Sequence, residues 1–188
     1  MRQYREKYIF PKLSTLLALF FTILGLMILI LQVYFTVSFS LPTHVLNIVG
    51  ADGSRIILHN NVSAKDPSYE ELKTFLRTDL TDSTPFDNNS FVCSDYAEVV
   101  HNNAEKYGIR AAFVSVDVYE REEGHACNAF NTTDNGLVFV DCTAPSLYDL
   151  ENNDAIVTMK IGENYNLEGL FGSHKFFDLT VKRYKIYW

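Results

Sequence analysis

The chain has 188 residues, of which 47% are aliphatic, aromatic or sulfur-containing and 21% are charged, so disorder is excluded as its main property. Residues 1–12 carry a net charge of +3, and residues 13–188 carry −10. An acidic main body excludes nucleic acid as a partner, because phosphate binding needs clustered Lys and Arg. Three cysteines are too few and odd in number for a disulfide framework, and the absence of a Cys-x-x-Cys pair argues against a zinc ribbon.

The amino-terminal region predicts a membrane anchor. Residues 13–51 contain no Asp, Glu, Lys or Arg. A bilayer core about 30 Å thick needs about 20 helical residues, so residues 13–39 are predicted to be a transmembrane helix that contacts membrane lipid. Basic residues precede this helix, and by the positive-inside rule residues 1–12 form a cytoplasmic tail while the rest lies outside the cell. A cleaved signal peptide is the alternative, but signal cores span about 7–15 apolar residues and this one is longer.

Two helices are predicted beyond the membrane segment. The first begins after Ser68, which can form a capping box with Glu71. The second covers residues 93–107, where apolar side chains recur at helical spacing, and Gly108 is placed to end it. His101 lies on this second helix beside polar neighbours and is expected to be solvated.

Strand-like runs surround these helices. Strands are expected within residues 41–58 (two runs around a turn), 110–118, 125–131, 137–142, 155–161 and 176–187. Residues 132–136 have turn chemistry and are predicted to form the five-residue loop of a hairpin. Helices followed by an antiparallel sheet are typical of an α+β fold, and residues 41–188 are predicted to be one such extracytoplasmic domain.

Three residues form a candidate nucleophilic site. Cys93 begins the second helix, where positive partial charge and unpaired N–H groups stabilise a thiolate. His125 begins one strand of the hairpin and Asp141 ends the other, and pairing residue 127 with residue 141 puts both on one face. Asp141 can then hold one imidazole nitrogen while the other nitrogen faces the Cys93 thiol. An activated sulfur nucleophile needs such a base and a group that orients the base.

The sequence around these residues carries a resemblance to a known superfamily. The motifs are Cys93-Ser94-Asp95-Tyr96-Ala97, His125-Ala126-Cys127-Asn128 and Val140-Asp141-Cys142-Thr143. The spacing is 32 residues from Cys to His and 16 from His to Asp. Over roughly residues 66–143 the chain resembles compact microbial members of the transglutaminase-like superfamily, whose fold is similar to that of papain-like thiol enzymes. The resemblance implies a nucleophile helix packed on an antiparallel sheet.

The same resemblance implies a reaction. Cys93 would be the nucleophile, His125 the general base and then acid, and Asp141 the residue that orients His125. The implied reaction is acyl transfer at amide bonds of a protein or peptide through a Cys93 thioester, by hydrolysis or transamidation and without a cofactor. The Cys93 N–H is one candidate oxyanion donor, and Asn88 and Asn89 are candidates for the second. A catalytically inactive domain that serves as a cell-surface binding or structural module is the alternative.

The same side chains allow two arrangements other than the triad. Cys93, His125, Cys127 and Asp141 are ligand types suited to zinc, but the triad already explains three of them, so no metal is expected. A disulfide between Cys127 and Cys142 is disfavoured, because the predicted register points them to opposite faces.

Three sequons are candidate N-glycosylation sites if the domain lies outside the cell. They begin at Asn61, Asn88 and Asn131.

Overall fold

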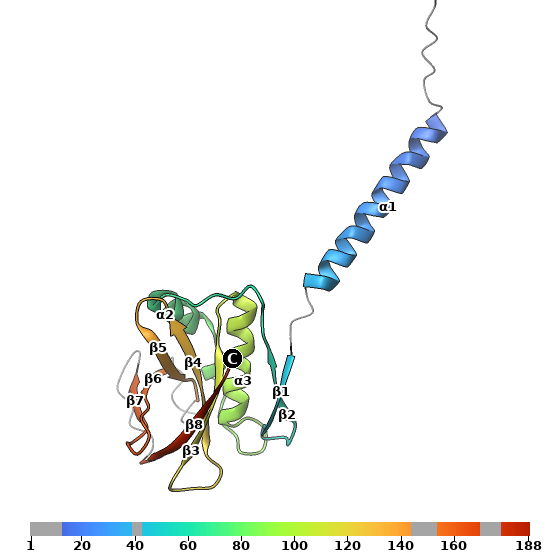
Figure 1. Ribbon diagram of the computed structural model, residues 1–188. Helices are drawn as coiled ribbons and strands as arrows, with labels where there is room; N and C mark the ends of the chain where they lie inside the picture. The colour runs from blue at the N-terminus through green and yellow to red at the C-terminus, as the bar shows by residue number, and fades with distance from the viewer. Residues whose placement is uncertain (1–12, 39–42, 144–153, 170–177) are drawn as a thin grey trace, which may run out of the picture. The chain divides into compact units, whose positions relative to one another are not determined.

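The computed structural model describes residues 13–38, 43–143, 154–169 and 178–188 (Figure 1). The chain divides into two compact units, Met1–Ser40 and Leu41–Trp188. The predicted cytoplasmic tail at residues 1–12, residue 39 of the predicted membrane helix and the first residues of the last predicted strand, 176 and 177, lie outside the described residues.

The first unit contains one helix, α1, over Leu13–Ser38. Its segment Ser14–Gln32 has a mean hydropathy of 2.6, and none of it is buried. Among the described residues, this is the one helix that is long and apolar enough to cross a membrane. The finding is compatible with the predicted single-pass anchor.

The second unit is an α+β domain, as the order of helices and strands in the sequence predicted (Figure 1). Its elements are β1 (Thr43–Val49), β2 (Arg55–His59), α2 (Tyr69–Thr78), the short 3-10 helix η1 (Thr81–Ser83), α3 (Cys93–Tyr107), β3 (Ala112–Val118), β4 (His125–Thr132), β5 (Gly136–Asp141), β6 (Ala155–Thr158), β7 (Asn166–Gly169) and β8 (Val181–Tyr187).

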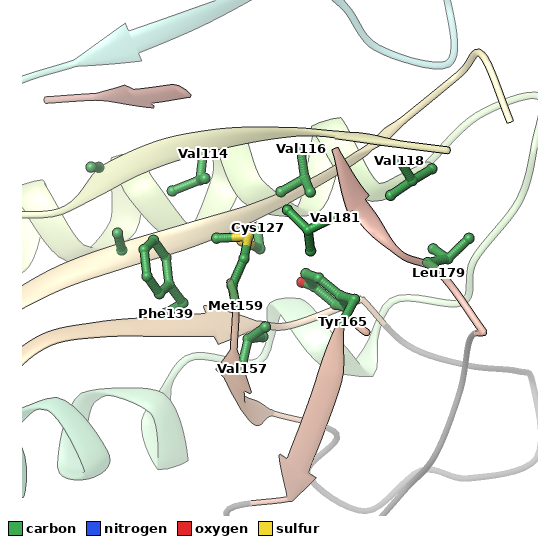
Figure 2. Packing of buried hydrophobic residues seen from close by; sticks show 12 residues of the cluster. Val114, Val116, Val118, Cys127, Phe139, Val157, Met159, Tyr165, Leu179 and Val181 are labelled. Atoms are coloured by element: carbon green, nitrogen blue, oxygen red, sulfur yellow. The ribbon is translucent and has the colours of Figure 1, made fainter. Parts of the chain in front are cut away.

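Strands β3 to β8 form a curled antiparallel sheet in the order β7-β6-β5-β4-β3-β8. One face of the sheet encloses a cluster of buried side chains from all of its strands except β7, together with residues of the connecting segments (Figure 2). The cluster includes Val114, Val116, Cys127, Phe139, Met159, Tyr165 and Val181. Because side chains alternate between the two faces along a strand, β3, β4 and β5 also contribute buried residues to the opposite face.

The opposite face of the sheet is covered by the helices. Leu72 and Phe75 of α2 pack with Val100 of α3 and with Phe130 and Val138 of the sheet. The hairpin of β1 and β2 packs through its own apolar residues against α3 and the start of β4. Helix α3 therefore lies between the hairpin and the sheet, and its first turn is held from both sides.

Both predicted helix boundaries are confirmed. The Ser68 side chain accepts a hydrogen bond from the Glu71 N–H, and the Glu71 carboxylate accepts one from the Ser68 N–H, so the capping box is complete. Helix α3 runs from Cys93 to Tyr107 and ends at Gly108, whose φ of 91° is in the left-handed region that glycine adopts without strain.

The hairpin of β4 and β5 confirms the predicted register and corrects its loop. Asn128 pairs with Val140, which is the alignment that also sets residue 127 opposite residue 141. Thr132 pairs with Gly136, and the Thr132 hydroxyl donates to the Gly136 carbonyl at 2.8 Å. The loop therefore has three residues rather than five, because Thr132 and Gly136 still pair and the Thr132 hydroxyl adds a hydrogen bond to that pair.

Two further expectations are corrected. His101 is fully buried rather than solvated, because the β1–β2 hairpin covers the face of α3 on which it lies. Strand β7 was not predicted, since its short polar sequence has no alternation, and β8 begins at Val181 rather than near residue 176.

Candidate active site

The register of the β4–β5 hairpin brings His125 and Asp141 together. His125 is the first residue of β4 and Asp141 the last residue of β5, so both stand at the same end of the antiparallel pair. The Nε2 atom of His125 lies 2.6 Å from Oδ2 of Asp141, and the two side chains are only 2% and 4% exposed. Asp141 is thus placed to fix the orientation of the imidazole.

Cys93 reaches the same point from the helical layer. It is the first residue of α3, and the first N–H groups of a helix have no acceptor within the helix. The thiol lies within hydrogen-bonding reach of His125 and accepts a hydrogen bond from the Ala126 N–H. Asp141 binds Nε2, so Nδ1 is the ring nitrogen through which His125 would contact Cys93.

Electrostatics at this point favour a thiolate beside an imidazolium. Burial opposes ionisation of Cys93, but the hydrogen bond and the positive charge of His125 outweigh it and lower the pKa of the thiol. Burial also opposes protonation of His125, but the Asp141 carboxylate outweighs it and raises the pKa of the imidazole to about 10. The pKa of Asp141 is lowered despite its burial, because His125 and Thr143 stabilise the carboxylate.

The other two cysteines differ from Cys93 in burial and in the direction in which the pKa of the thiol is shifted. Cys127 and Cys142 are 1% and 3% exposed, and burial raises the pKa of both thiols. They belong to clusters on opposite faces of the sheet, as the register predicted, and all three cysteines are free. Cys93 is therefore the one cysteine whose surroundings favour the thiolate.

Asp141 has two further partners, which the sequence did not predict. The Thr143 N–H donates to Oδ1 at 2.9 Å, and the Tyr165 hydroxyl donates to Oδ2 at 2.9 Å. The ring of Tyr165 also packs edge-on against the His125 imidazole, with 5.2 Å between ring centroids. Tyr165 precedes a strand that has no periodic signal, 24 residues beyond Asp141, so nothing in the sequence marks it as part of the site.

Gly124 fixes how the chain enters β4. Its φ is 64°, and a Cβ at this position would lie 2.7 Å from the carbonyl oxygen of Val116. Only glycine meets both conditions without strain, and the next residue is His125. The close approach of Gly124 to Val116 of β3 therefore fixes the backbone conformation immediately before His125.

A cleft of about 910 Å³ opens on the site. It is lined by residues of β1, the start of α3, the β3–β4 connection and the end of β5, and Cys93, His125 and Asp141 are among them. Apolar side chains such as Ile48, Val92 and Leu167 form much of its wall. The Cys93 thiol is therefore open to another molecule from this side.

The two candidate oxyanion donors are placed differently. Asn88 is exposed and lines the cleft. Asn89 donates its side-chain amide to Asp87 and lies outside the described lining of the cleft. The geometry therefore keeps Asn88 as a candidate beside the Cys93 N–H and removes support for Asn89.

The sequon asparagines also differ in their surroundings. The Asn61 amide donates to the Glu105 carbonyl at 3.0 Å, and the exposed Asn131 donates to Asp66 at 2.9 Å. The exposed Asn88 lies beside the cleft, so a glycan there would stand at its entrance.

Within the described part of the chain, no group of three or more His, Cys, Asp or Glu side chains could hold a metal ion. No protein-family model, curated protein or solved structure matches the chain.

Proposed function

We propose that the chain is a membrane-anchored thiol enzyme that transfers acyl groups at amide bonds of a protein or peptide. The proposal rests on one observation. The side chains of Asp141, His125 and Cys93 contact one another in series, and the series ends with Cys93 at the wall of an open cleft. A structural histidine needs neither a lowered thiol pKa on one side nor a cleft beside that thiol. An acyl-transfer enzyme needs both.

The first half of the reaction forms a thioester. The Cys93 thiolate attacks the amide carbonyl carbon, and the carbonyl electron pair moves to oxygen. The Cys93 N–H at the start of α3 and the Asn88 side chain are the candidate donors to that oxygen. The C–N bond then breaks, and His125 gives its proton to the leaving amine.

The second half of the reaction releases the acyl group. Neutral His125 takes a proton from water or from an acceptor amine, whose oxygen or nitrogen attacks the thioester carbonyl. The C–S bond breaks and the Cys93 thiolate returns beside a protonated His125. Water gives hydrolysis and an amine gives transamidation, and Asp141 holds the imidazole in place through both steps.

We also propose that the domain is a compact, membrane-anchored member of the transglutaminase-like superfamily. A cysteine at the start of a helix, a histidine at the start of a strand and an aspartate on the next strand support this assignment. Helix α1 would anchor the domain in the cell membrane, with residues 1–12 in the cytoplasm and residues from 41 outside. The substrate would then be a protein or peptide of the extracytoplasmic space.

The test is the alkylation rate of each cysteine by iodoacetamide against pH, measured by peptide mass spectrometry on the full chain in detergent micelles. The proposal expects Cys93 to react well below the ordinary thiol pKa of about 8.5. At pH 6 it also expects His125→Ala to slow Cys93 by at least about tenfold, because the imidazolium no longer stabilises the thiolate.

Three controls make the result specific. Cys127 and Cys142 are internal controls, since both are buried with raised thiol pKa values. His44→Ala removes an exposed imidazole from β1 and should leave the Cys93 rate unchanged. A Cys93 that reacts like an ordinary thiol, with or without His125, would overturn the enzyme proposal and favour an inactive domain that serves as a cell-surface binding or structural module.

A further inference from the structure

We infer that Tyr165 is a positioning residue of the candidate active site, which acts on Cys93 and His125 through its hydrogen bond to Asp141. The inference rests on the proposed function and adds a fourth residue to it. The Tyr165 hydroxyl donates to the same carboxylate oxygen, Oδ2, that accepts from His125 Nε2. Tyr165 and His125 therefore bind the same carboxylate oxygen, so a shift of one side chain alters the hydrogen bond of the other.

The position of Tyr165 is fixed by its backbone and by its packing. Its N–H donates to the Leu179 carbonyl at 2.7 Å, which ties it to the segment that leads into β8. The residue is 2% exposed and belongs to the cluster inside the curled sheet. Figure 2 shows the ring reaching into this cluster, with its hydroxyl end toward Cys127 and Val181. A hydroxyl held in this way has little freedom to leave Asp141.

Asp141 needs such a donor because it is buried. Burial by itself raises the pKa of its carboxyl and favours the neutral acid, which could not balance the charge of an imidazolium. The donated hydrogen bonds from His125, Thr143 and Tyr165 favour the carboxylate. Tyr165 supplies the one of these bonds that comes from outside the β4–β5 hairpin and its extension.

The phenol is suited to this task because it does not ionise near neutral pH. Burial raises the pKa of Tyr165 well above its ordinary value, so its hydroxyl remains a donor across the working range of a thiol enzyme. The other titratable groups around Asp141 are His125 and Cys127 from β4, Cys93 from α3 and Cys142, the residue after β5. The thiols of Cys127 and Cys142 stay protonated because burial raises their pKa values.

The test is Tyr165→Phe, which removes the hydroxyl and keeps the ring against His125. The readout is the alkylation of Cys93 by iodoacetamide against pH, in the full chain in detergent micelles. A carboxylate with one donor fewer takes up a proton at higher pH and aims the imidazole less well. We expect the acid midpoint of the profile to move up by about one pH unit and the plateau rate to fall about threefold to tenfold.

Tyr184→Phe is the matched control. Tyr184 packs edge-on against Phe139 beside the same cluster, so it loses the same oxygen without touching Asp141. The double variant Tyr165→Phe/Asp141→Asn adds a second control. If Tyr165 acts through Asp141, the double variant should have the profile of Asp141→Asn alone.

Each outcome decides the inference. A Tyr165→Phe profile that superimposes on that of the native chain overturns it, and so does an equal shift in Tyr184→Phe, which would mean general loosening of the cluster. Additive effects in the double variant also overturn it. The proposed function fails on a separate result, namely that Cys93 is alkylated at the same rate in the native chain and in His125→Ala.

Discussion

The carboxylate of Asp95 accepts a hydrogen bond of 3.0 Å from the N–H of Ala51, a residue 44 positions earlier in the chain. The same oxygen accepts from the Val92 N–H at 2.8 Å, so Asp95 joins the first turn of α3 to the β1–β2 turn. Gly50 lies so close that a Cβ there would stand 2.0 Å from Asp95 Oδ1. Asp95, which belongs to the same sequence motif as Cys93, therefore holds the first turn of α3 in place.

Replacing Asp95 should loosen this link. Asp95→Ala leaves two backbone N–H groups without their acceptor, and we expect the free energy of unfolding of the domain to fall by about 1–3 kcal/mol. Denaturant titration of the chain in micelles, followed by tryptophan fluorescence, measures this change. Asp52→Ala is the control, since Asp52 accepts only within its own exposed turn. Equal effects of the two variants would contradict the role of Asp95 as a link.

Gly124 offers a second test of how the site is positioned. In Gly124→Ala the new Cβ meets the Val116 carbonyl in a backbone conformation with φ of 64°. We expect a stability loss of about 2 kcal/mol and slower alkylation of Cys93, since His125 is the next residue. Gly53→Ala is matched to it, because Gly53 has a φ of 80° and no atom within 4 Å of the added Cβ. If Gly124→Ala lost no more stability than Gly53→Ala and its Cys93 were alkylated as fast, the proposed role of Gly124 at the start of β4 would be contradicted.

The alkaline side of the alkylation profile should report His125. The pKa of this imidazole is raised to about 10, above the value of about 6.5 for an unfolded histidine, so the stabilisation it gives is complete below about pH 6.5 and is lost progressively as the pH rises to about 10. We expect a second inflection of the Cys93 rate near that pH, when the thiolate loses its positive partner. The measurement is the iodoacetamide profile extended to alkaline pH.

His125→Ala should abolish the second inflection, while His44→Ala should retain it. An inflection that persists without His125 would assign it to another group and weaken the ion-pair interpretation.

His101 should make the domain less stable in acid. Burial lowers the pKa of its imidazole to about 4, and it is fully buried. Its Nδ1 lies 3.2 Å from Asn102 Oδ1, and Nε2 has no hydrogen-bond partner among the described residues. As the pH falls below about 6.5 the unfolded chain binds a proton that the folded chain refuses, so stability falls until about pH 4, by about 3 kcal/mol in total.

Unfolding free energies of the native chain and of His101→Phe, measured between these pH values, test this expectation. The variant should lose most of the acid-side slope, because it has no imidazole to protonate. His44→Gln removes an exposed imidazole whose charge contributes less than burial to the lowered pKa of His101, so it should keep most of the slope. A native chain whose stability is flat over this range would contradict the assignment to His101.

Local sequence was enough to predict the elements that carry the site. The Ser68 capping box, the start of α3 at Cys93 and the left-handed Gly108 depend on residues within a few positions of one another, where backbone hydrogen bonding and helical spacing decide the outcome. The hairpin register was also predictable, because the alternation of side chains allows His125 and Asp141 to share a face in only some alignments.

The tertiary structure decided what surrounds those elements. Tyr165 joins Asp141 only because the sheet curls and brings the segment before β7 over the end of β5, and no pattern within that segment encodes the approach. His101 is buried only because a hairpin from an earlier part of the chain lies over its helix. Periodicity reports which side of an element is apolar, whereas the partner that covers that side depends on long-range packing. The sequence by itself thus determined the candidate nucleophile, base and orienting acid, and packing between distant segments determined the residues that hold them.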